Sequence, residues 1–174
     1  MLKGKNNERF DTLLSVKSSL ITLYLALTFP IIFISNDNLR VLSIICFISG
    51  FILTFNITND FVTINENSIK LNTSLVSNFF GKKSWELFWK DISLIKTFST
   101  SQGSKVHYFI TSKNKSFLIP QRIERIGEFK EILSRKLNFF DSNFEYISPL
   151  WTYKLLTFIS SFMLLGEIYL FVIK

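Results

Sequence analysis

The sequence predicts an α+β membrane protein, in which three transmembrane helices accompany one small antiparallel β-domain closed by a C-terminal amphipathic helix. Three long apolar runs interrupt a chain of 174 residues, 48% of which are hydrophobic. The polar stretch between the second and third runs changes from the two-residue period of strands to the period of a helix. Roughly 90 residues lie in this stretch, enough for one small hydrophobic core.

The three apolar runs have the length and composition of membrane-spanning helices. Residues 18–35 carry no charge, and their length is close to the about 20 residues that cross the hydrocarbon of a bilayer. Pro30 lies in the outer third of this run, where we expect a kink that a membrane helix tolerates. Residues 39–58 follow after three polar positions, which predicts a tight helical hairpin. Residues 155–173 form the third run.

The placement of lysine and arginine predicts the orientation in the membrane. Lys3, Lys5, Arg9 and Lys17 precede the first run, whereas Arg40 alone lies near the turn of the hairpin. Basic residues favour the cytoplasmic side of a membrane. We therefore expect a cytoplasmic tail at residues 1–17, a transmembrane hairpin at 18–58, a cytoplasmic domain at 59–149 and a transmembrane helix at 150–174 that leaves the C-terminus outside.

Alternation of apolar and polar residues predicts five to seven strands in the central stretch. We expect them at residues 61–64, 69–72, 85–90, 91–98, 106–111 and 116–119. Pro120 ends the sheet, and from about Arg122 the period becomes helical. One face of this helix is apolar and comprises Ile123, Ile126, Phe129, Ile132, Leu133 and Leu137.

This order of elements resembles the bacterial membrane-associated PH-like domain family. The likeness consists of a two-span hairpin, a strand hairpin over residues 61–71, a W-x-D-I step at Trp89-Lys90-Asp91-Ile92, an Ile119-Pro120 step and a closing helix rich in Glu and Leu/Ile. The resemblance implies a barrel-like sandwich of seven strands and one helix. It also implies a non-catalytic binding or scaffolding role.

The chain is also similar to the photosystem I assembly factor family of plastids and cyanobacteria. Its members have two N-terminal spans followed by a soluble domain with F-x-G-K, D-I and I-P-L-T steps. Phe79-Phe80-Gly81-Lys82, Asp91-Ile92 and Ile119-Pro120 match the first two steps and the start of the third. This second resemblance implies assembly of a membrane complex in a thylakoid membrane.

Basic and aromatic residues of the predicted domain are the candidates for binding. A lysine or arginine near a membrane surface attracts anionic headgroups by at most about 1 kcal/mol, and tryptophan is enriched at membrane interfaces. A solvated basic surface that obeys the same charge bias is the plainer interpretation. The candidate residues for membrane-surface or partner binding are Lys82, Lys83, Trp85, Trp89, Lys90, Arg122 and Arg125.

Glu167 is the one acid inside an apolar run. An ionisable residue within a span marks a functional hypothesis, and the adjacent Gly166 permits close helix packing. We expect Glu167 to make an intramembrane polar contact with a structural role. A role in ion or proton transport is the alternative.

Cys46 and His107 are the single cysteine and the single histidine of the chain. One cysteine excludes a disulfide framework or a cysteine-based metal site within one chain, and little material remains for zinc sites or nucleophilic triads. We therefore predict no enzymatic activity, no cofactor and no metal. The chain carries no recognised nucleic-acid-binding motif, so nucleic acid is not an expected partner.

The sequence thus predicts a non-enzymatic, membrane-anchored scaffold that presents a small cytoplasmic β-domain at the membrane surface. The expected partners are the bilayer itself, including anionic lipid, and a membrane or cytoplasmic protein. Self-association into a homo-oligomer stays open. The alternatives are a photosystem assembly factor in a thylakoid membrane and a small transport or channel accessory subunit that uses Glu167.

Overall fold

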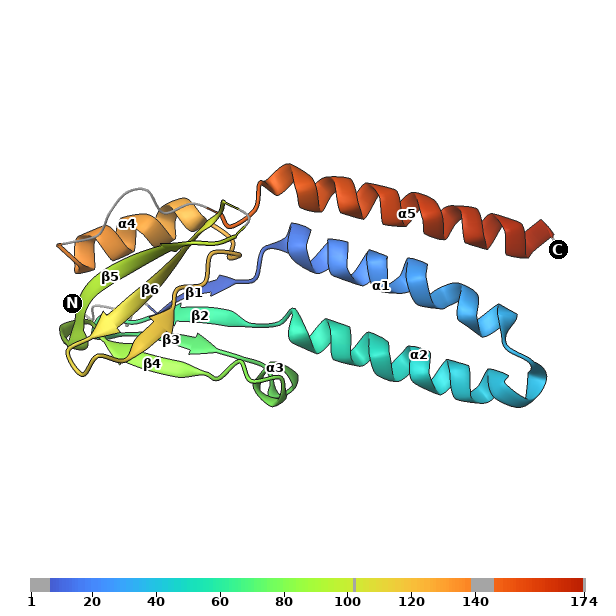
Figure 1. Cartoon of the computed structure of the whole chain (residues 1–174), viewed down its shortest axis with the longest axis horizontal. Coiled ribbons are helices and arrows are strands. Elements are labelled where there is room, and N and C mark those ends of the chain that lie inside the picture. Colours follow the sequence, from blue (N-terminus) through green and yellow to red (C-terminus); the bar gives the residue numbers. More distant parts are fainter. Residues whose placement is uncertain (1–6, 102, 139–145, 174) are drawn as a thin grey trace, which may run out of the picture. The chain divides into compact units, whose positions relative to one another are not determined.

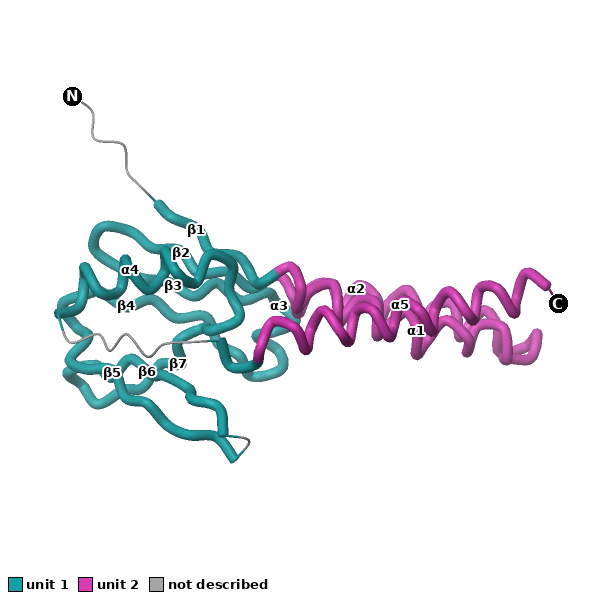
Figure 2. Tube along the Cα trace, turned by 90° about the horizontal axis from the view of Figure 1, so that it is seen from above, with its two compact units in different colours: residues 1–13, 60–148 teal, residues 14–59, 149–174 magenta. Residues whose placement is uncertain are grey.

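A computed structural model describes residues 7–101, 103–138 and 146–173 of the chain. The chain divides into two compact units, residues 1–13 with 60–148 and residues 14–59 with 149–174 (Figure 2). The first unit contains the strands and the second contains three long helices (Figure 1). Lys3 and Lys5, on which part of the predicted orientation depends, lie outside the described residues.

The helical unit consists of α1 (Leu14–Ile34), α2 (Asp37–Ile57) and α5 (Leu150–Ile173). Each helix is long and apolar enough to cross a membrane. α1 and α5 begin before the apolar runs 18–35 and 155–173, because polar residues such as Lys17 and Lys154 continue the helical backbone without belonging to the apolar segment. α1 continues through Pro30.

Small and hydroxylated side chains let the three helices approach each other closely. Ser19 on α1 and Ser160 on α5 are each 1% exposed, and the Thr22 hydroxyl lies 2.8 Å from the Ser160 hydroxyl. Between α1 and α2, the Tyr24 hydroxyl donates a 2.7 Å hydrogen bond to the Phe47 carbonyl. Contacts of this kind can hold helices together in lipid, where the hydrophobic driving force between helices is absent.

The first sheet has the strand order β1 (Glu8–Asp11), β2 (Phe61–Ile64), β3 (Ser68–Asn72) and β4 (Trp85–Phe88), with every pair antiparallel. Phe10 pairs with Val62 and Asp11 pairs with Phe61. β1 lies within residues 1–17, for which the sequence predicts only a tail. The helical hairpin is therefore inserted between two neighbouring strands of one sheet.

The second sheet has the order β5 (Ile92–Ser99), β6 (Lys105–Thr111) and β7 (Ser116–Leu118), again antiparallel. A short 3₁₀ turn at Trp89–Asp91 separates β4 from β5, at the break that the sequence predicts. A short helix that the sequence did not predict, α3 (Leu75–Phe79), lies between β3 and β4.

The closing helix, α4 (Ile126–Lys136), begins later than the predicted Arg122. Arg125 adopts a left-handed conformation with φ of 51°, which cannot continue a right-handed helix, and Ile123 instead forms a β-bridge with Thr12.

The Tyr146 phenol lies at the start of α4. Burial raises the pKa of the Tyr146 phenol, and the Glu124 carboxylate raises it further, although a hydrogen bond with the Ile126 backbone opposes the shift.

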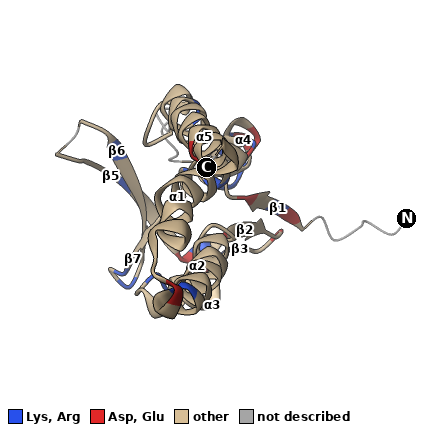
Figure 3. Cartoon of the chain, turned by 90° about the vertical axis from the view of Figure 1, so that its right-hand side faces the viewer, with Lys and Arg blue, Asp and Glu red and all other residues tan. Residues whose placement is uncertain are grey.

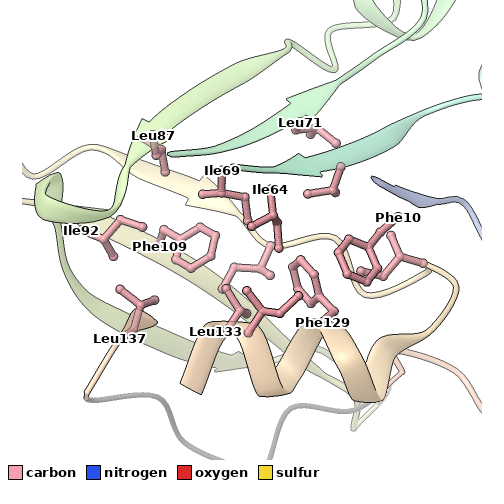
Figure 4. Close-up of a cluster of buried hydrophobic side chains, with 14 residues drawn as sticks. Phe10, Ile64, Ile69, Leu71, Leu87, Ile92, Phe109, Phe129, Leu133 and Leu137 are labelled. Atoms are coloured by element: carbon pink, nitrogen blue, oxygen red, sulfur yellow. The ribbon is translucent and has the colours of Figure 1, made fainter. Parts of the chain in front are cut away.

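The core of the β-domain lies between the two sheets and α4 (Figure 4). Phe10, Phe109 and Phe129 are fully buried, and the rings of Phe10 and Phe129 meet edge to face with centroids 5.4 Å apart. The buried residues of α4 fall on the predicted apolar face. The predicted α+β class, with antiparallel sheets and three helices of spanning length, is confirmed.

Phe10 tests whether β1 belongs to this core. Phe10→Ala should destabilise the β-domain by about 3–5 kcal/mol, because it deletes a fully buried ring. Hydrogen exchange of the full chain in nanodiscs should show faster exchange in β2 and α4. Phe88→Ala is the matched control, since that ring is 48% exposed. Equal protection in the two variants would contradict the placement of β1.

Ser160 tests the contact between α1 and α5. Ser160→Leu should destabilise the helical unit by about 1–3 kcal/mol, because the larger side chain forces two closely packed helices apart. Thermal unfolding of the full chain in detergent measures the effect. Ser49→Leu is the control because Ser49 is exposed on α2. An unchanged melting temperature for Ser160→Leu would show that this packing is absent.

Candidate partner-binding surface

The second sheet presents one apolar face away from the core. Strand side chains alternate between faces, and Ile95, Phe109 and Phe117 point to the core. The cross-strand pairs Leu94–Ile110, Lys96–Tyr108, Phe98–Val106 and Tyr108–Leu118 lie on the opposite side. We name this side the outer face, and it comprises Leu94, Lys96, Phe98, Val106, Tyr108, Ile110 and Leu118.

The outer face is exposed and nearly uncharged. Leu94 and Phe98 are each 46% exposed, and Leu118 is 44% exposed. The Phe98 ring packs edge to face on Tyr108 with centroids 5.6 Å apart, and the Lys96 ammonium lies 5.2 Å from the Phe98 ring centre. β5 and β6 contain no acidic residue, and their ribbons are mostly tan in Figure 3. Contiguous apolar surface of this kind marks interaction sites in soluble domains.

β5 also leaves one edge of the sheet unpaired. No other strand of the described residues pairs with β5 on the side opposite β6, and most of its eight residues are exposed. A free edge presents a row of backbone N–H and C=O groups to any approaching strand. Together, the edge and the outer face can bind an extended polypeptide through its backbone and its apolar side chains.

His107 lies beneath the outer face, on the core side of β6. It is 4% exposed, and its Nδ1 atom lies 2.9 Å from the Thr97 hydroxyl. Its backbone carbonyl accepts a 2.9 Å hydrogen bond from the Ile119 amide. His107 therefore joins β5, β6 and the end of β7. Among the described residues, no three His, Cys, Asp or Glu side chains gather to hold a metal ion.

The two tryptophans of the predicted binding set pack against the core. The Trp85 ring lies edge to face on Phe109, with centroids 6.0 Å apart. The Trp89 Nε1 atom donates a 3.1 Å hydrogen bond to the Asn65 carbonyl. Lys90 is exposed, with its ammonium 5.8 Å from the Phe88 ring centre. Trp89, Lys90 and Phe88 line a shallow hollow of about 410 Å³.

The two arginines of the predicted set connect the segment before α4 with β1 and the residues that follow it. The Arg125 guanidinium donates a 2.7 Å hydrogen bond to the Arg9 carbonyl, pairs with Glu128 at 2.9 Å and lies 4.9 Å from the centre of the Phe10 ring. The Arg122 carbonyl accepts a 2.9 Å hydrogen bond from the Leu13 amide. Both residues thus help to hold β1 in the domain.

The predicted residues do not form one cluster. Lys82 pairs with Asp60 at 2.6 Å, and Lys83 is exposed next to it. The two tryptophans and Lys90 lie at the core and the shallow hollow, and the two arginines lie beside β1. The outer face was not among the surfaces predicted from the sequence. A signal was present in β6, where Val106, Tyr108 and Ile110 alternate with the buried Phe109, so that both faces of the strand are apolar.

Glu167 lies on α5, in the helical unit. Its Oε2 atom is buried and has no hydrogen-bond partner among the described residues. The expected polar contact of this carboxylate therefore stays a prediction.

Comparisons with known proteins give one distant relative. No family model matches the chain, and no solved structure matches it. The chain is similar to a protein of the cyanobacterium Synechocystis sp. that is named "Uncharacterized protein slr0269". The two are 27% identical over 158 residues, which cover 87% of this chain and 79% of the relative. A likeness of this extent includes parts of both compact units of this chain.

Proposed function

We propose that this chain is a non-enzymatic, membrane-anchored scaffold that presents its β-domain at the cytoplasmic surface of a membrane to a protein partner. The observation that carries the proposal is the outer face with the free edge of β5. Apolar surface and an unpaired strand are features of an interface, and the three helices supply the anchor.

Anchoring in a membrane agrees with the way the two units are connected. α1 and α2 leave and rejoin one sheet at neighbouring positions, Asp11 and Phe61, so a pair of spanning helices returns the chain to its starting side. α5 then crosses once and leaves the C-terminus on the other side. The basic residues before α1 favour the cytoplasm for the β-domain.

The proposal includes a PH-like fold for the β-domain. A sheet of four strands and a sheet of three strands, followed by one helix, agree with the arrangement that the resemblance implies. β1 supplies the seventh strand from before the helical hairpin.

A protein suits the outer face better than a lipid does. The face contains one cation, Lys96, and headgroup attraction from one charge is at most about 1 kcal/mol. The backbone groups of the β5 edge are matched only by another polypeptide strand. Assembly of photosystem I in a thylakoid membrane is one specific form of the same proposal, in which the partner is a subunit of that complex.

A transport or channel accessory role is the second candidate. The buried Oε2 atom of Glu167, without a hydrogen-bond partner among the described residues, favours it. We rank it second because the outer face lies in the other unit and a transport role leaves it unexplained.

Site-specific photocrosslinking in native membranes tests the scaffold proposal. A photoreactive amino acid at Phe98 should give a discrete protein adduct, because this side chain lies on the outer face beside the free edge. Adding Leu94→Glu should remove the adduct, since it places a charge in the apolar contact. A mass of twice the chain would identify the partner as a second copy.

The matched control carries the same amino acid at Phe88, which is 48% exposed compared with 46% for Phe98. Equal adducts at positions 88 and 98, or adducts at 98 with lipid alone, would contradict the proposed interface.

A further inference from the structure

The most exposed apolar side chains of the described β-domain gather in one short segment. Leu75 is 89% exposed, Phe79 is 87% exposed and Phe80 is 68% exposed. The exposed fractions of Leu75 and Phe79 exceed those of Phe158 and Phe162 on α5, at 70% and 72%, and that of Phe80 is slightly below them. A small soluble domain does not ordinarily leave such side chains in water together. We name residues 74–83, which contain them, the α3 loop.

Hydrogen bonds within the α3 loop hold these side chains outward. The Ser74 hydroxyl accepts a 3.0 Å hydrogen bond from the Ser77 amide and so caps α3. The Lys82 amide donates to the Ser77 carbonyl at 3.0 Å. Gly81 closes the turn with φ of +87°, a conformation that favours glycine. The exposure of the apolar residues is therefore a property of an ordered turn.

One buried carboxylate, three residues after α2 in the sequence, holds both ends of the α3 loop. Asp60 is 5% exposed; its Oδ1 atom accepts a 2.9 Å hydrogen bond from the Ser74 amide, and its Oδ2 atom pairs with the Lys82 ammonium at 2.6 Å. Asp60 follows Ile57, the last residue of α2, by three positions. Three residues of chain span at most about 11 Å, and each interfacial layer of a bilayer is about 5–8 Å thick. If α2 spans a membrane, the chain therefore keeps Asp60 at or close to the interfacial layer.

The charges of the α3 loop suit a membrane surface. Lys82 and Lys83 follow the aromatic pair after Gly81, and no acid occurs between Glu66 and Glu86. Apolar and aromatic residues beside lysines are the composition of segments that lie in the interface, where rings sit at headgroup level and lysines meet anionic lipid.

We propose that the α3 loop inserts into the interface of the membrane that α2 crosses. Leu75, Phe79 and Phe80 enter the boundary between headgroups and acyl chains, and Lys83 contacts anionic headgroups. The loop thereby holds the β-domain against the bilayer. This inference rests on the proposed function, because it requires α2 to span a membrane.

Fluorescent labels on the full chain in lipid nanodiscs test the insertion. In a Cys46→Ser background, an environment-sensitive dye at Phe79→Cys should emit at shorter wavelength and be quenched by shallow brominated lipids. The same dye at Phe88→Cys should report water. Adding Lys83→Gln should weaken the dependence of quenching on anionic lipid by about fivefold, the effect of one surface charge.

A third label at Phe55→Cys, on the exposed side of α2, separates the two proposals. Quenching at position 55 without quenching at position 79 overturns the insertion and leaves the membrane anchor intact. A dye that reports water at both positions overturns the anchor itself. A dye at position 79 that is shielded in native membranes but not in nanodiscs also overturns the insertion, because a protein then covers the loop.

Discussion

The antiparallel pairing of β1 with β2 constrains every other part of this chain. Phe10 and Val62 face each other in this pair and are both fully buried, yet two apolar helices separate them along the chain. The β-domain cannot form its core until the hairpin has brought these strands together. The helices in turn must run antiparallel, since they start and end at one sheet. Arg125, just before α4, reinforces the pair through a hydrogen bond to the Arg9 carbonyl.

Much of this fold can be predicted from the sequence, because periodicity and hydrophobic length are local properties. The three long apolar helices, the strands from residue 61 onward and the buried face of α4 all follow from such patterns. β1 does not, since its four residues contain one apolar side chain, Phe10, and no alternation. A strand this short is defined by its distant partner β2. α3 is equally difficult to predict, because its five residues bury no apolar face.

The candidate surfaces could be predicted only in part, for a related reason. Charge and residue type single out Lys82 and Lys83, which do lie beside the exposed aromatic residues of the α3 loop. The same criteria single out Trp85 and Trp89, whose rings the fold uses for packing. The outer face escapes such reasoning, because alternation shows that β6 is apolar on both sides but not which side remains uncovered. Which side of β6 is covered depends on α4 and the first sheet, which are distant from β6 in the sequence.

In this account a β-domain in water is interrupted by a membrane hairpin, with both of its parts on one side of the bilayer. Labelling of single cysteines with a membrane-impermeant maleimide in sealed vesicles tests this most directly, in a Cys46→Ser background. Glu8→Cys and Lys113→Cys should react from the same side, and Asn38→Cys, in the first turn of α2, only from the other. Reaction of positions 8 and 38 from one side, or of 8 and 113 from opposite sides, would contradict the account.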